Sequence, residues 1–262
     1  MGVNMDSSKK VREYIFSELE DSNLKIGDRL PTEIQLATHL NVSRSSVREA
    51  LQSLKSIGLL NSSQGSGYTI IGNATATFSE ALRVIMATTP IQFTDISEIR
   101  EALEMKAVQL AIRNHITTDS LHQLYDCVEH MKLANTSNIA QKYDIDFHRK
   151  IAKLSGNPFL INFIEALSQF SDRYILISWN DITSRQKENL ITSHNNIIQY
   201  LQEGKTDEAQ KEIVNHYKLA DSIIQSITNH STRQSIEKIL SKLYSEGFND
   251  EQILSRLSSL SQ

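Results

Sequence analysis

Apolar residues recur with a period near 3.6 over most of the chain, which is the spacing of one buried helix face. Strand-like alternation of apolar and polar residues appears only around Leu59 to Ile71. The pattern therefore predicts a mostly α-helical protein with one small β-hairpin. Helices are expected at residues 8–20, from Thr32 to Leu40, from Ser43 to Gly58, and at 78–87, 95–114, 118–134, 138–155, 158–179, 184–203 and 206–229.

A run of small residues, 72–77, separates two groups of helices and is expected to be a linker. Thr77 and Glu80 have the spacing of a capping box and should open the next helix. Because the loops beyond it are short, the helices there should form an antiparallel bundle. We expect an N-terminal domain at 1–72, an all-helical domain at 73–230, and a C-terminal extension of two short helices at 231–262, whose role the sequence does not indicate.

The segment that follows Asn41 has the pattern of a recognition helix. Ser43 is a natural N-cap, and the helix after it is apolar on one face at Val47, Ala50, Leu51 and Leu54. In a helix-turn-helix, the first residues of the second helix reach base edges in the major groove, and an arginine fork can donate two hydrogen bonds to guanine. The candidate DNA contacts are Arg44, Ser45 and Arg48, on the opposite face.

A hairpin is expected directly after this helix, with a glycine-rich tip from Gln64 to Gly67. Such a wing can lie along the minor groove, where Gly65 would let the backbone approach closely. Without a wing, Arg44 and Arg48 are also explained as residues on the solvated face of a plain helical hairpin. A wing at this distance favours DNA binding and predicts a winged helix-turn-helix.

The charge distribution does not oppose this interpretation. The net charge of the chain is −4, but residues 29–72 contain four basic and two acidic residues, a net of +2. Only local charge matters for contact with phosphate. The longest apolar runs, such as Tyr174 to Trp179, are too short to span a bilayer, and the single Cys127 cannot form an internal disulfide. These features favour a cytoplasmic protein with no membrane partner.

Three histidines and one aspartate lie where a metal site could form. Asp144 and His148 are four residues apart and share a helix face, whereas His194 and His216 have apolar neighbours at helical spacing. Imidazole and carboxylate ligands suit zinc, nickel, iron or manganese better than calcium. Each histidine is also explained as a hydrogen-bonded core residue, and spacing alone does not decide between these alternatives.

The residues of the N-terminal domain resemble the winged-helix signature of the GntR family nearly position by position, over about 8–72. The resemblance implies that Arg44 and Arg48 contact DNA and that Gly65 lies at the wing tip. Many members carry a DNA-contacting arginine at the position of Ile34, which cannot make that contact. The matching residues are Gly27 to Glu33, Leu36, Ala37, Val42 to Arg44, Val47 to Leu51, Leu54, Gly58 and Leu59.

Residues 78–225 resemble the helical C-terminal domain of the FadR subgroup, through Glu98 to Glu104, the Asp144–His148 segment, Ser155 to Pro158, His194 and His216. The resemblance implies a divalent metal on Asp144, His148, His194 and His216, and a small carboxylate effector. It also implies effector contacts from Arg100 and Asn157, although Arg100 is explained equally by a surface ion pair. Members that bind long acyl chains lack this ligand set.

The expected function is therefore a ligand-responsive transcription regulator, a repressor in the simplest case. It should bind its double-stranded DNA operator as a homodimer, because one short recognition helix reads too few base pairs. The alternative is a metal-dependent hydrolase, since a metal with an open position can activate water. Against an enzyme, the sequence contains no GxxxxGK[ST], HExxH or GxSxG motif.

Overall fold

The computed structural model describes residues 7–63 and 67–230 and confirms the mostly α-helical fold. The chain forms two compact units, divided between Thr88 and Thr89, and each has its own hydrophobic core. The division lies after the first helix of the expected second domain, whereas the sequence places the domain boundary at 72/73. The helices expected within 231–262 fall outside the described residues.

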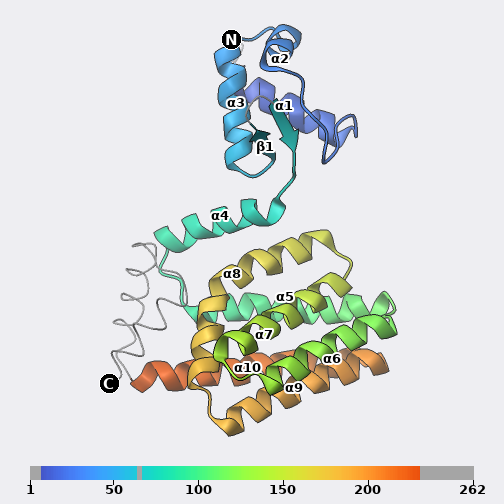
Figure 1. Ribbon diagram of the computed structural model, residues 1–262, viewed down its shortest axis with the longest axis vertical. Helices are drawn as coiled ribbons and strands as arrows, with labels where there is room; N and C mark the ends of the chain where they lie inside the picture. The colour runs from blue at the N-terminus through green and yellow to red at the C-terminus, as the bar shows by residue number, and fades with distance from the viewer. Residues whose placement is uncertain (1–6, 64–66, 231–262) are drawn as a thin grey trace. The chain divides into compact units, whose positions relative to one another are not determined.

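The N-terminal unit is a helix-turn-helix followed by a two-stranded antiparallel wing (Figure 1). Thr32 and Gln35 form the expected capping box, and Ser43 Oγ accepts a hydrogen bond from the backbone N–H of Ser46 (3.1 Å). In the wing, Leu60 pairs with Ile70. The elements are α1 (Ser7–Glu20), α2 (Glu33–Leu40), α3 (Arg44–Ser56), β1 (Leu60–Ser63), β2 (Gly67–Ile70) and α4 (Ala74–Thr88).

Helix α4 begins inside the stretch 72–77, so the prediction of a linker there was wrong. Asn73 Oδ1 accepts a hydrogen bond from the backbone N–H of Ala76 (3.0 Å) and starts the helix earlier than expected. The hydroxyl of Thr77 does not open a capping box. It donates instead to the backbone carbonyls of Ile57 and Asn73.

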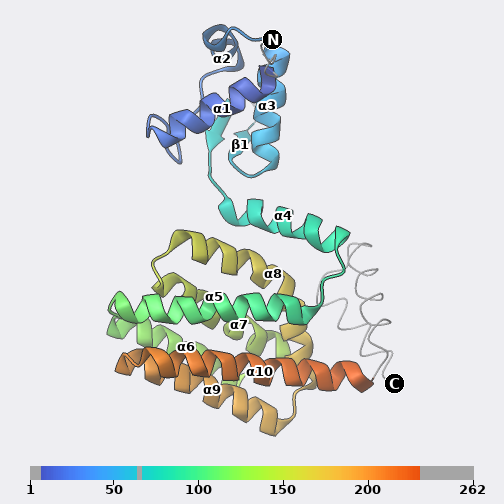
Figure 2. The same cartoon turned by 180° about the vertical axis from the view of Figure 1, so that it is seen from behind.

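The second unit is the expected bundle, and each helix end lies within two residues of its predicted position. Helix α5 lies beside α10 (Figure 2), and α10 also packs on α9. Neighbours joined by short loops, such as α6 and α7 or α9 and α10, are antiparallel because the chain reverses between them. The helices are α5 (Phe93–Arg113), α6 (Thr118–Leu133), α7 (Ser137–Leu154), α8 (Pro158–Asp181), α9 (Ser184–Glu203) and α10 (Thr206–His230).

Candidate metal centre and nucleic-acid interface

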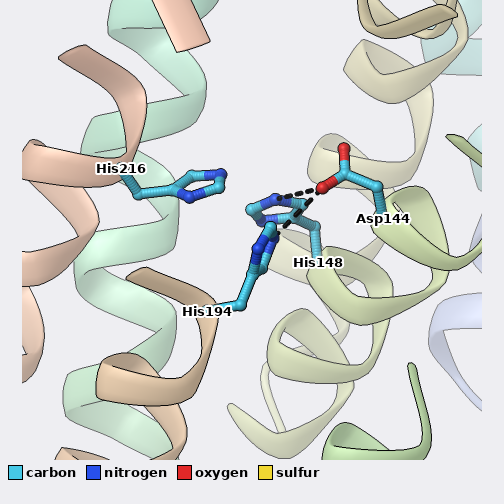
Figure 3. A group of neighbouring side chains, drawn as sticks. All are labelled: Asp144, His148, His194 and His216. Carbon is cyan, nitrogen blue, oxygen red and sulfur yellow. Dashed lines mark ion pairs between the residues drawn. The ribbon is translucent and has the colours of Figure 1, made fainter. Parts of the chain in front are cut away.

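Four side chains from three helices converge in the core of the bundle (Figure 3). Asp144 and His148 come from α7, His194 from α9 and His216 from α10, and all four are buried. One ligand atom from each lies within 4.8 Å of the others. The four residues that the sequence singled out therefore form a group that could hold a metal ion.

His148 is oriented by Glu104, a fully buried residue of α5. His148 Nδ1 lies 2.5 Å from Glu104 Oε2, and the same carboxylate accepts hydrogen bonds from the Tyr217 hydroxyl (2.6 Å) and Arg100 Nη2 (3.2 Å). Burial alone would raise the pKa of Glu104, but the charge and hydrogen bond of His148, with Arg100 and Tyr217, lower it to about 2. Glu104 is thus ionised and acts as an acceptor. His148 Nδ1 must carry a proton, which leaves Nε2 available on the side of Asp144.

His194 is held in a comparable way by its own helix. Its Nδ1 lies 2.8 Å from the carbonyl oxygen of Leu190 and must donate, because a carbonyl only accepts. Its Nε2 is 3.1 Å from Asp144 Oδ1 but lacks the geometry of a hydrogen bond. His216 Nδ1 has no hydrogen-bond partner among the described residues. Two buried imidazole nitrogens in this group therefore lack hydrogen-bond partners among the described residues.

The electrostatics favour the protonation states that metal ligands need. Burial, together with the charges of His194 and His148, lowers the pKa of His216 well below its ordinary value. Burial acts to raise the pKa of Asp144, but the interaction with His194, whose Nε2 lies 3.1 Å from Asp144 Oδ1, lowers it overall. At neutral pH the group therefore offers a neutral imidazole at His216 and a carboxylate at Asp144.

A narrow cavity of about 40 Å³ opens beside these residues, lined in part by Asp144, His148, His216 and Arg100. Arg100 is 4% exposed, so the alternative of a surface ion pair is wrong for this side chain. Its Nη1 donates to Ser171 Oγ (2.6 Å), and its Nε has no hydrogen-bond partner among the described residues. A buried cation with an unused N–H therefore borders the cavity.

Asn157 does not reach this cavity. It is exposed at the start of α8, where Oδ1 accepts hydrogen bonds from the backbone N–H groups of Phe159 (3.0 Å) and Leu160 (3.3 Å). In the structure its side chain serves as a helix N-cap. Glu104 was not predicted as a site residue. The available signal was a charged residue on the same helix stripe as the apolar Ala107 and Ala111.

The expected DNA-reading residues lie on the exposed face of α3, opposite its buried apolar residues. Arg44 and Ser45 are exposed in the first turn, and Gly65 lies outside the described residues. Arg48 forms an ion pair with Glu33 of α2 (2.8 Å), a contact that sequence reasoning missed because the two residues are on different helices. Among the described residues, no helix combines the length and apolar character needed to cross a membrane.

Two family models match the chain. The model described as "Bacterial regulatory proteins, gntR family" matches residues 7–70, and the "FCD domain" model matches 95–219. These ranges fall on the helix-turn-helix with its wing and on the bundle that contains the four-residue group. The two models thus account separately for the two candidate sites.

Individual relatives agree with this assignment. The chain is 30% identical over 241 residues to the putative L-lactate dehydrogenase operon regulatory protein of Escherichia coli K12, covering 87% of this chain and 90% of that protein. It is 28% identical over 229 residues to the transcriptional repressor NanR of Enterobacter sp. strain 638, covering 79% and 83%. Streptococcus agalactiae GntR, a solved structure, has a TM-score of 0.61 and 24% identity, covering 84% of this chain and 99% of that one, and so shares the fold.

The family and these relatives are regulators and not enzymes, so the alternative of a metal-dependent hydrolase is rejected. The chain belongs to the GntR family of bacterial regulatory proteins, in its FadR subgroup, and is a DNA-binding transcription regulator with an FCD ligand-binding domain.

Proposed function

We propose that this regulator is a homodimeric repressor whose operator affinity is controlled by a small organic acid bound at a metal site in its helical unit. Asp144, His148, His194 and His216 would hold the metal, and Arg100 would contact the effector. The observation that carries the proposal is the pair of buried imidazole nitrogens, on His194 and His216, that lack hydrogen-bond partners among the described residues.

A bound divalent cation explains this group of residues better than a site that is empty or filled with water. Buried polar atoms without partners are costly, and a cation would satisfy both nitrogens and the Asp144 carboxylate together. The donor set of three imidazoles and one carboxylate favours zinc, nickel or manganese. A bound ion would supply positive charge and open coordination positions for an anionic ligand.

The cavity supports a small carboxylate as the effector. Arg100 is fixed by Ser171 and Glu104 and retains an unused N–H, so it can donate to an anion without reorienting. The volume of about 40 Å³ disfavours a long acyl chain. The E. coli relative is named for an L-lactate dehydrogenase operon, which makes short 2-hydroxy acids the first compounds to test.

Dimerisation is proposed because one α3 helix contacts too few base pairs for useful specificity, and two half-sites about 10 base pairs apart would be read together. An effector that changes the separation of the two α3 helices would prevent one of them from contacting its half-site. Light scattering should give a dimer, and a footprint should cover a near-palindrome. A monomer that protects a single half-site would contradict this part of the proposal.

The test of effector control uses the full-length protein and an operator selected from random duplexes. L-lactate should change the Kd for operator about 5–150-fold, corresponding to a coupling free energy of about 1–3 kcal/mol. Anisotropy titrations with and without L-lactate measure this change. This response should disappear after chelation and in His194→Ala, while DNA affinity without effector is retained. His122→Ala, an exposed histidine on α6, is the matched control and should respond like the wild type. A response of equal size after metal removal would contradict metal-dependent control.

A further inference from the structure

The guanidinium of Arg48 donates two hydrogen bonds from one edge to the carboxylate of Glu33. Arg48 Nε donates to Glu33 Oε1 (3.2 Å), and Arg48 Nη2 donates to Glu33 Oε2 (2.8 Å). The contact joins α2 to α3, and the side chain of Arg48 is still 61% exposed, against 21% for Glu33. The hydrogen bond from Arg48 lowers the pKa of Glu33, so the carboxylate is ionised at neutral pH.

The bonding pattern leaves the outer edge of Arg48 outside this contact. A guanidinium has five N–H groups, and Glu33 engages the Nε–H and one Nη2–H. The remaining edge, formed by Nη1 and Nη2, is the one that donates two parallel hydrogen bonds to guanine O6 and N7. Arg48 therefore need not leave Glu33 to read a guanine.

Glu33 is itself held firmly. It is the first residue of α2, between the two residues of the Thr32–Gln35 capping box, and α2 is anchored in the core by Leu36 and Leu40. Its negative charge also suits the positive end of the helix dipole. A fixed carboxylate restricts the rotamers of a long, flexible arginine before DNA arrives, so less conformational entropy is lost on binding.

We propose that Glu33 is a positioning residue for DNA recognition, which presents the outer edge of Arg48 to a guanine in each half-site. The inference rests on the proposed reading of DNA by α3. It makes a prediction that runs against simple electrostatics, because an acid near DNA should repel phosphate. If Glu33 acted only by repulsion, its removal would strengthen binding to every duplex.

The experiment compares Glu33→Ala, Glu33→Gln and Arg48→Ala in the full-length protein on three kinds of DNA. These are the selected operator, operators with each base pair of a half-site replaced in turn, and an unrelated duplex, all at one fixed salt concentration. Glu33→Ala should weaken operator binding about 10-fold and abolish discrimination at the same base pair that Arg48→Ala affects. Affinity for unrelated DNA should stay the same or rise. Glu33→Gln, which keeps an acceptor oxygen without the charge, should lie between Glu33→Ala and the wild type.

Two controls make the result specific. Glu49→Ala removes an exposed acid from α3 and should leave base discrimination unchanged. The double variant Glu33→Ala/Arg48→Ala should bind the operator no more weakly than Arg48→Ala alone, because the two residues act as one unit. Circular dichroism confirms that each variant is folded.

The role of Glu33 would be overturned if Glu33→Ala strengthened binding equally to all duplexes or left base discrimination unchanged. It would also be overturned if the losses of operator affinity in the two single variants added up in the double variant. If Arg48→Ala itself leaves operator binding unchanged, the proposed contact of Arg48 with DNA fails first. The two failures are therefore distinguishable.

Discussion

The imidazole of His148 and the carboxylate of Glu104 are joined by a 2.5 Å contact in the buried centre of the helical unit. Glu104 comes from α5 and His148 from α7, so the contact ties a residue outside the four-residue group to one inside it. It sets which ring nitrogen carries the proton and leaves the other for a ligand position.

Replacing Glu104 by Gln should therefore weaken metal binding by about 10–100-fold, because the ring of His148 would lose both its orientation and the nearby negative charge. Competition with a zinc chelator measures the change. Glu98→Gln, an exposed acid on the same helix, is the matched control and should bind as the wild type does. Unchanged metal affinity in Glu104→Gln would show that Glu104 does not support the metal ligands.

The depressed pKa of His216 predicts a pH dependence of stability in the metal-free protein. The unfolded chain takes up a proton at this residue near pH 6.5, whereas the buried ring in the native state resists protonation. Acidification thus favours the unfolded state, and the free energy of unfolding should fall as the pH is lowered through the ordinary imidazole range.

Urea titrations with chelator present measure this effect as the difference between the wild type and His216→Gln. The variant lacks the titrating ring, so its stability should decline less over the same pH range. Parallel pH profiles for the two proteins would show that His216 does not carry the dependence.

Arg44→Ala and Arg48→Ala should each weaken specific DNA binding by about 1–3 kcal/mol while the fold stays intact. Both side chains lie on the exposed face of α3, away from its buried residues Val47, Leu51 and Leu54. Anisotropy titrations at constant salt measure the loss. Operator affinity that is unchanged in both variants would rule out α3 as the reading helix.

Much of the fold could be predicted because its local signals agree. The helices follow the apolar periodicity of the sequence. The structure also contains the expected Thr32–Gln35 capping box and the Ser43 N-cap. The prediction failed at 72–77, where small residues suggested a linker. Asn73 is an equally good N-cap there, and the Thr77 hydroxyl bonds to the carbonyl of Ile57, which is distant in sequence.

The candidate metal group could also be predicted, because Asp144 and His148 share a helix face and His194 and His216 lie among apolar residues. The residue that orients one of these ligands could not be predicted from the spacing of residues along the sequence. Glu104 contacts His148 across 44 positions of the chain, and Glu33 meets Arg48 on another helix. Asn157 is expected to contact the effector only through the family resemblance, and an Asn before Pro158 at a helix start is sufficient to explain the N-cap that the structure shows.

The most direct test of the metal-controlled site is elemental analysis of the wild type and His194→Ala, purified without chelator or a metal-affinity tag. We expect about one divalent transition metal ion per wild-type chain, as four converging ligands from a single chain imply. The variant should lose most of this metal, and its melting temperature should be lower, because a ligand that binds only the native state stabilises it. If the wild type contains no stoichiometric metal and added zinc, nickel or manganese leaves its melting temperature unchanged, then Asp144, His148, His194 and His216 form a polar core network and not a metal site.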